Sequence, residues 1–203
     1  MQECENPKLI QHAAFNEWAS NSLWIGSNKN KGLAIVAKSH IKLTLLDWDS
    51  SNLQLFLPCL INDEFLLLAI WTKQANSPNF QYIGQIWKYL QLHSDKFINP
   101  KTILIGDWNS NTRWDEWDRW WNHSDVVKLL GEVGIQSIYH YQNNEAQGSE
   151  KNPTFYMNRN LEKSYHIDYA FLSNDLLQPA NVSIGNPSEW LQFSDHMPVI
   201  VSI

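Results

Sequence analysis

The segment Phe65–Trp71 constrains the fold most, because it is an unbroken run of apolar residues. It is far too short to cross a bilayer, which takes about 20 apolar residues as a helix. Successive side chains of a β-strand point to opposite faces, so a strand that is apolar at every position must be covered on both faces. The sequence therefore predicts a central strand with a packed layer above it and another below it.

Further strand candidates flank this segment. Phe56–Ile61 is predicted to pair with Phe65–Trp71 across the turn Asn62-Asp63-Glu64, and Leu23–Gly26 is predicted to pair with Gly32–Ala37. Short apolar stretches predict four more strands, at residues 101–106, 170–172, 182–184 and 199–203. Hairpins of this kind are typical of antiparallel sheets.

Two helices are predicted from apolar residues that recur at helical spacing. One covers Asn79–His93, and the other covers Val126–Val133, with Ser124 as its N-cap and Gly134 at its C-terminal end. Hairpins interleaved with a few helices predict an α+β architecture, in which two packed, mainly antiparallel β-sheets are flanked by helices.

Polar residues cluster where several predicted strands begin or end. Gly106-Asp107-Trp108-Asn109 follows an apolar strand, His166-Ile167-Asp168 precedes another, and Ser194-Asp195-His196-Met197-Pro198-Val199 leads into the last. Carboxylates of this kind hold Mg²⁺ or Mn²⁺ and align water, while histidine or asparagine donates hydrogen bonds to phosphoryl oxygens. The combination indicates the hydrolysis of a phosphate ester.

These three motifs, in this order, resemble those of the endonuclease/exonuclease/phosphatase superfamily, which has the deoxyribonuclease I-like fold. Gln2-Glu3 fits as a fourth motif, because the superfamily carries a Gln-Glu pair at the end of its second strand. The resemblance spans the chain from its first residues to its last. It implies a deoxyribonuclease I-like sandwich that uses Mg²⁺ or Mn²⁺.

The resemblance also implies roles for individual residues. Asp107 would align the attacking water, and Asn109 would stabilise the transition state. His196 would contact the scissile phosphate and would be held by Asp168. The metal ion would be bound by Glu3, with Asp195 beside it.

Aromatic residues near these motifs have two interpretations. Trp71 lies where relatives often place His or Tyr against the phosphate, and Phe155 lies in a loop where relatives that cut DNA carry an aromatic wedge. Both residues are therefore candidates for substrate binding. For each of them, packing in the core is an equal alternative. A third group, Trp114, Trp117, Trp120 and Trp121, stands among acidic residues. We therefore expect these indoles to pack on the sandwich rather than to stack on bases.

Composition limits the possibilities further. The 203 residues form a single-domain length, and 43% hydrophobic with 18% charged residues is typical of a folded globular chain. The net charge of −6 argues against a strong, sequence-independent grip on DNA, although it does not exclude a nuclease. Cys4 and Cys59 form neither a disulfide framework nor a zinc site, so a reducing compartment, the cytoplasm, is expected.

One domain is expected over residues 1–203. Members of the superfamily have a first strand that carries an asparagine, then a helix, before the strand that ends in Gln-Glu. Nothing of this kind precedes Gln2, so we expect the domain to be N-terminally truncated.

The sequence thus predicts a metal-dependent phosphodiesterase of the nuclease type, with DNA or RNA among its possible phosphate-ester substrates. A phosphatase acting on a small molecule or a lipid head group is the alternative that the acidic charge slightly favours. The second alternative is a catalytically crippled binding domain, which is suggested by the missing first strand and by the lack of His or Tyr near Trp71.

Overall fold

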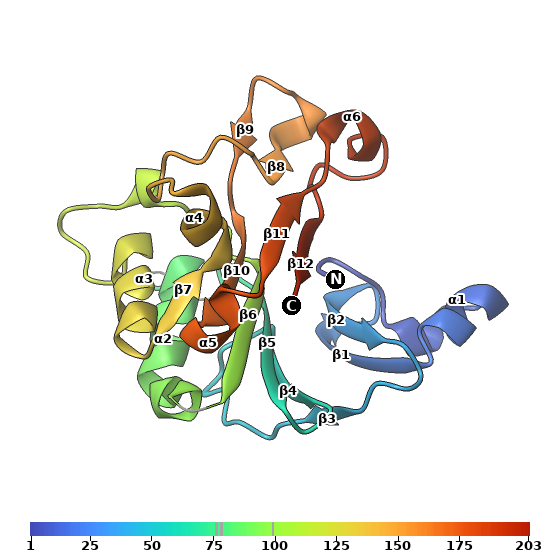
Figure 1. Cartoon of the computed structure of the whole chain (residues 1–203). Helices are drawn as coiled ribbons and strands as arrows, with labels where there is room; N and C mark the ends of the chain where they lie inside the picture. The colour runs from blue at the N-terminus through green and yellow to red at the C-terminus, as the bar shows by residue number, and fades with distance from the viewer. Residues whose placement is uncertain (76, 78, 99) are drawn as a thin grey trace.

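The computed structural model describes residues 1–75, 77, 79–98 and 100–203. At its centre lies a six-stranded mixed sheet (Figure 1). In order across the sheet, the strands are β3 (Leu43–Leu45), β4 (Phe56–Ile61), β5 (Phe65–Trp71), β6 (Lys101–Asp107), β10 (Asp168–Ser173) and β7 (Ile135–Ser137). Strands β5 and β6 are parallel, and the other neighbours are antiparallel.

The remaining strands form three two-stranded sheets. These pair β1 (Asn21–Asn28) with β2 (Lys31–Ala37), β11 (Asn181–Ile184) with β12 (Val199–Ser202), and β8 (Phe155–Tyr156) with β9 (Ser164–Tyr165). The α-helices are α1 (Ala13–Trp18), α2 (Ile83–His93), α3 (His123–Glu132), α4 (Ile138–Asn143), α5 (Asn174–Leu177) and α6 (Pro187–Trp190). Short 3₁₀ turns are η1 (Pro7–Leu9), η2 (Ser94–Phe97), η3 (Thr112–Trp114) and η4 (Met157–Arg159). Within the described residues, none of these helices is long and apolar enough to span a membrane.

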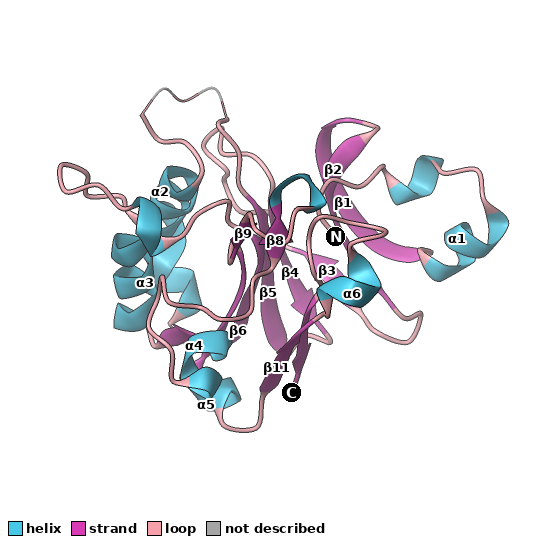
Figure 2. Ribbon diagram, turned by 90° about the horizontal axis from the view of Figure 1, so that it is seen from above, coloured by secondary structure: helices cyan, strands magenta, loops and turns pink. Residues whose placement is uncertain are grey.

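Strand β5 is covered on both faces, as its sequence predicted. Leu66, Leu68 and Ile70 face a core shared with α2 and α3. Leu67 and Trp71 face the opposite way, into a core shared with β2. Figure 2 shows α2 and α3 on one side of the main sheet and β1 and β2 on the other.

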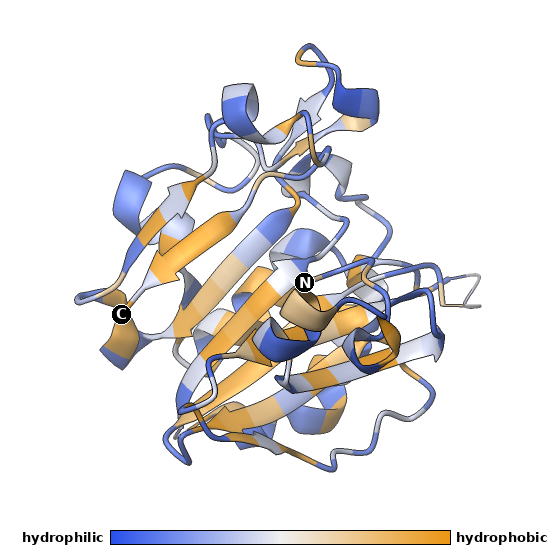
Figure 3. Cartoon of the chain, turned by 90° about the vertical axis from the view of Figure 1, so that its right-hand side faces the viewer, coloured by the Kyte–Doolittle hydropathy of each residue, from blue (hydrophilic) through white to orange (hydrophobic). Residues whose placement is uncertain are grey.

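The predicted α+β sandwich is confirmed, and both predicted hairpins form. The second layer, however, is not one continuous sheet. It consists of β1–β2 and β11–β12, and a groove of about 550 Å³ separates them. Its walls include Leu33–Val36 and Met197–Val199, and its floor includes Ile105, so hydrophobic residues dominate it (Figure 3). Residues Met1 and Cys4 pair with the open edge of β2 beside this groove.

The two predicted helices form, but their starts differ from the prediction. Helix α2 begins at Ile83 rather than Asn79, because Tyr82 adopts φ 47° and ψ −111°, which no helix accommodates. Helix α3 is capped by Asn122 rather than Ser124, and the Asp125 carboxylate accepts the backbone N–H of Asn122 in a capping box. Ser124 therefore lies inside the first turn.

The expectation that the tryptophan-rich segment packs on the sandwich is wrong for three of its four indoles. Trp121 packs on Phe80, with ring centroids 4.5 Å apart. Trp114, Trp117 and Trp120 remain 45%, 97% and 63% exposed. The only helical turn in this segment is η3, which is too short to direct four indoles to one face.

Gly106 fixes the approach of β6 to β5 just before Asp107. Its φ is +152°, and a Cβ at this position would lie 1.8 Å from the Ile70 carbonyl oxygen. Any other residue would push the two parallel strands apart. The close contact of these strands therefore sets the position of the Asp107 carboxylate.

Candidate active site

The centre of the candidate site consists of two carboxylates on adjacent strands. Asp107 ends β6 and Asp168 begins β10, and the two are direct partners in the antiparallel ladder. Both are buried, at 3% and 7% exposed. Thr154 accepts the backbone N–H of Asp168 through its hydroxyl oxygen at 2.9 Å, which fixes the start of β10.

His196 completes this cluster from the other side of the sandwich. Its Nδ1 lies 2.9 Å from Oδ2 of Asp168. One potential ligand atom from each of Asp107, Asp168 and His196 lies within 4.8 Å of the other two. An isolated bridge to Phe155 holds the backbone of His196 just before β12.

Asn109 folds back onto Asp107 instead of continuing the strand. Its φ of 45° is left-handed, and its backbone N–H donates to Oδ1 of Asp107 at 2.8 Å. Its side-chain amide donates to Oδ2 of Asp107 at 2.7 Å and to the Thr72 carbonyl at 3.2 Å. The two side chains therefore form one hydrogen-bonded unit, in which Asn109 holds the Asp107 carboxylate in place.

The pKa values of Asp107 and His196 in this cluster are both raised. Burial, and next the charge of Asp168, raise the pKa of Asp107 to about 7, with a smaller contribution from Glu3. Burial would lower the pKa of His196, but the hydrogen bond and charge of Asp168, together with Asp107 and Asp195, raise it to about 9. The structure therefore favours an imidazolium at His196 at neutral pH, which donates protons and does not bind a metal.

The two predicted metal ligands lie outside this three-residue cluster. Glu3 has a left-handed φ of 55° and pairs with Lys31, with Oε2 and Nζ 2.6 Å apart. Its side chain is half-exposed and lies close enough to Asp107 to raise the pKa of that carboxyl. Asp195 is half-buried, and its carbonyl accepts the Tyr156 N–H at 2.8 Å.

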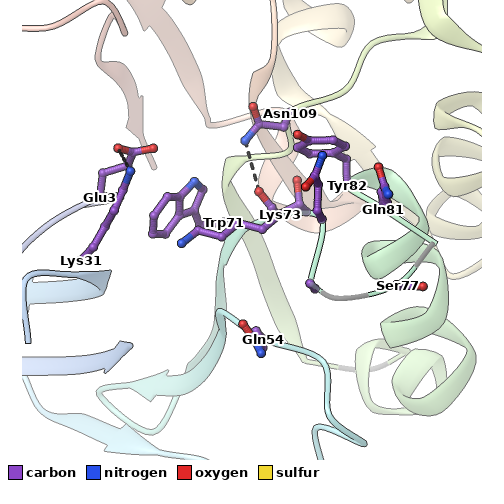
Figure 4. A pocket seen from close by; sticks show the side chains of 12 residues that line it. Glu3, Lys31, Gln54, Trp71, Lys73, Ser77, Gln81, Tyr82 and Asn109 are labelled. Carbon is purple, nitrogen blue, oxygen red and sulfur yellow. Dashed lines mark hydrogen bonds and ion pairs between the residues drawn. The ribbon is translucent and has the colours of Figure 1, made fainter. Parts of the chain in front are cut away.

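A cavity of about 710 Å³ opens beside Asn109 and extends to Glu3 (Figure 4). Trp71 lies between these residues and is only 2% exposed. Lys73 Nζ lies 3.8 Å from the Trp71 ring centroid, and Lys31 Nζ lies 5.5 Å from it. Trp71 thus packs in the core while one side of its ring supports two cations at the cavity wall.

Phe155, the second predicted substrate-binding residue, lies against the catalytic candidate His196. Their ring centroids are 4.6 Å apart. Sequence reasoning missed Lys31, Lys73 and Thr154. Lys73 follows the end of β5, next to the end of β6, and this placement beside Asp107 is the only sequence signal that would have indicated it.

Two further histidines, His123 and His166, are buried close to the cluster of Asp107, Asp168 and His196 in the sequence or the fold. His123 is fully buried, with Nδ1 3.2 Å from the Ser110 hydroxyl, and burial lowers its pKa to about 4. Burial also lowers the pKa of His166, whose Nδ1 lies 2.8 Å from the Asn152 carbonyl. His166 is therefore a structural residue.

We expect His123 to make the fold sensitive to acid. A neutral His123 in the fold and a pKa of about 6.5 in the unfolded chain mean that the unfolded state binds more protons between pH 6.5 and 4. Stability is lost in this window as pH falls, by about 1.4 kcal/mol per pH unit for this histidine. Other titrating groups contribute equally to wild type and to a His123→Phe variant, so urea unfolding of both isolates this effect. The difference in unfolding free energy should move in favour of the variant as pH falls; a constant difference would contradict the assignment.

Comparison with known proteins agrees with the architecture. No model of a known protein family matches the chain, and no curated protein matches its sequence. Solved structures do match. A 3′-5′ exonuclease, NExo, from Neisseria meningitidis aligns with a TM-score of 0.70 at 17% identity, over 98% of this chain and 85% of that one. An AP endonuclease from Archaeoglobus fulgidus aligns with a TM-score of 0.66 at 18% identity, over 99% of this chain and 85% of that one.

A third match is the 3′ phosphatase NExo from Neisseria bound to a product DNA hairpin, with a TM-score of 0.65 at 17% identity, over 97% of this chain and 83% of that one. Similarity at this level of identity establishes the fold. The chain has the deoxyribonuclease I-like fold that its sequence motifs predicted.

Proposed function

We propose that this chain is a metal-dependent phosphodiesterase of the nuclease type. The observation that carries the proposal is the buried cluster of Asp107, Asp168 and His196, with Asn109 bonded to Asp107 at the edge of an open cavity. Hydrolysis of a phosphodiester needs a group that aligns water and groups that neutralise the developing charge. This cluster supplies both, in a fold that carries nucleases and a phosphatase among its solved members.

In the proposed reaction, the carboxylate of Asp107 orients the attacking water and accepts its proton. The pKa of about 7 suits a group that must take up and release a proton near neutrality. His196, positively charged and held by Asp168, donates a hydrogen bond to a phosphoryl oxygen through its free Nε2. Asn109 donates to the same group once substrate displaces one of its present hydrogen bonds.

The charges of the site fit a divalent cation. Asp107, Asp168 and Glu3 repel one another enough to raise the pKa of Asp107, and Lys31 already neutralises Glu3. Glu3 would hold Mg²⁺ or Mn²⁺, with Asp195 contributing, because hard cations prefer carboxylate oxygen. When bound, the cation supplies positive charge to the phosphoryl group. Glu3 would have to exchange Lys31 for the metal, so Lys31 becomes available to the substrate.

Metal removal tests this proposal directly. Hydrolysis of single- and double-stranded DNA, RNA and bis(p-nitrophenyl) phosphate is assayed with Mg²⁺, with Mn²⁺ and with EDTA. Turnover of at least one phosphodiester should require the metal and return when the metal is restored after EDTA. A Glu3→Gln variant should need a higher metal concentration for half-maximal rate than wild type. Full activity in EDTA would show that the reaction does not need a metal ion. Inactivity on every phosphodiester would show that the protein is not a phosphodiesterase.

A phosphatase is the second candidate, and the net charge of −6 favours it, because a strong grip on nucleic acid normally needs a basic surface. A phosphomonoester series in the same assay separates the two functions. Faster hydrolysis of small phosphomonoesters than of any phosphodiester would establish the second candidate.

A further inference from the structure

The segment 112–122, which we call the tryptophan loop, presents indoles to solvent without an evident structural use. Trp117 is 97% exposed, and Trp114 and Trp120 are 45% and 63% exposed. Large apolar side chains gathered on a surface mark a binding site more often than chance. Because exposing an apolar ring to water is unfavourable, the exposure of these indoles needs another explanation.

The tryptophan loop is held in a defined conformation. The buried Asn122 amide donates to the carbonyls of Glu116 and Arg119, both at 2.9 Å, and its oxygen accepts the Glu116 N–H at 2.9 Å. Arg119 donates through Nη2 to the Trp114 carbonyl at 2.8 Å. Trp117 therefore stands on a braced loop, and binding through it would cost little conformational entropy.

A chain of aromatic rings connects this loop to the candidate active site. Trp114 lies 5.4 Å from Tyr165, Tyr165 lies 6.4 Å from Phe155, and Phe155 lies 4.6 Å from His196, each measured between ring centroids. The loop follows β6 and lies at the same end of the main sheet as β8 and β9 (Figure 1). A strand that leaves the active site can thus pass over successive rings.

Two of the three acidic residues of the loop are engaged by neighbouring groups of the chain. Asp115 accepts the backbone N–H groups of His123 and Ser124 at the start of α3. Glu116 pairs with Arg119 at 3.3 Å. Of the three acids between Trp114 and Arg119, only Asp118 has no such hydrogen bond or ion pair among the described residues, and Arg113 and Arg119 leave segment 112–122 with a net charge of only −1.

We propose that the tryptophan loop is a stacking platform for unpaired bases, and that the substrate of the proposed phosphodiesterase is single-stranded nucleic acid or a single-stranded end. Exposed aromatic rings bind single strands because every base offers a π-face, whereas paired bases are already stacked on each other. A duplex offers Trp117 no free face. This inference rests on the proposed function, because it places the strand by the phosphate at His196.

The test compares Trp117→Ala with Tyr141→Ala, a control that removes another exposed aromatic ring, from α4, where it lines neither the cavity beside Asn109 nor the groove beside His196. Binding of a fluorescein-labelled oligothymidylate and of a blunt duplex is measured by anisotropy in EDTA. Trp117→Ala should weaken binding of the single strand by roughly 5- to 100-fold and leave the duplex unchanged. Tyr141→Ala should change neither. The far-UV circular dichroism and the thermal midpoints of all three proteins should agree, which shows that a loss of binding does not come from unfolding.

The outcomes separate this inference from the proposed function. Equal single-strand binding by Trp117→Ala and wild type overturns the platform, even if the protein is an active phosphodiesterase. No single-strand binding by wild type, or tighter binding of the blunt duplex, also overturns it. Single-strand binding that depends on Trp117, in a protein that hydrolyses no phosphodiester, supports the platform and rejects the reaction.

Discussion

Replacing Asp107 by asparagine is expected to lower kcat by roughly 10²–10⁴-fold while the protein stays folded. The substitution keeps the shape of the side chain but removes the carboxylate that aligns water. It also sets an amide against the side-chain amide of Asn109, which now donates to Oδ2 of Asp107. Stability should not fall, because burial and Asp168 already disfavour the charge on Asp107. The thermal midpoint should be equal to or above that of wild type, and steady-state kinetics in Mg²⁺ or Mn²⁺ gives the rate.

A matched control is Asp63→Asn. Asp63 lies in the exposed turn between β4 and β5, at the opposite end of β5 from Trp71, where it pairs with Lys42. This variant should retain wild-type kcat. Wild-type activity in Asp107→Asn would remove the proposed mechanism, whereas loss of folding in that variant would show that the carboxylate has a structural role.

Removal of the His196 imidazole is expected to reduce kcat by roughly 10²-fold or more, because it deletes the positive charge next to the phosphoryl group. Asp168→Asn should also reduce kcat, since Asp168 positions His196 through the 2.9 Å contact between Oδ2 and Nδ1. The two residues act as a pair, so the His196→Ala/Asp168→Asn double variant should lose much less than the product of the two single losses.

The double-mutant cycle distinguishes pairing from independent roles. Multiplicative losses would mean that Asp168 acts on water, metal or Asp107 rather than through His196. Circular dichroism and thermal melts of all four proteins must agree for this comparison, because Asp168 also begins β10. A His196→Ala protein as active as wild type would exclude His196 from the reaction.

Local sequence patterns predicted those elements of the fold whose signals are local. The hairpin β4–β5 was predicted at its observed bounds, because an apolar run, a short turn and a second apolar run leave few alternatives. The start of α3 was not predicted correctly, because Asn122 and Ser124 are both good N-cap residues. Which of them caps the helix depends on the contacts of Asn122 with Glu116 and Arg119. The division of the second layer depends on pairing between distant segments, which no local pattern specifies.

The candidate site was predicted as a list of residues and not as a geometry. Asp107 and Asp168 meet because β6 and β10 pair in a register that their sequences do not reveal. Asn109 lies just beyond the end of β6, and its left-handed backbone, which the sequence does not specify, returns it to Asp107. Lys31 carried no sequence signal, and Lys73 carried only its place after the end of β5, since lysines are common and their approach to Trp71 is what distinguishes these two.

The unpaired edge of β12 has a consequence for the protein at high concentration. Strand β12 pairs only with β11 among the described residues, and Ile200 on this strand is half-exposed. Unpaired N–H and C=O groups beside an apolar side chain form a template for strand exchange between molecules. The four-residue length of β12 limits such self-assembly, and so does Pro198 just before it, which has no N–H to donate. Colloidal stability thus depends on the shortness of one strand as well as on the net negative charge.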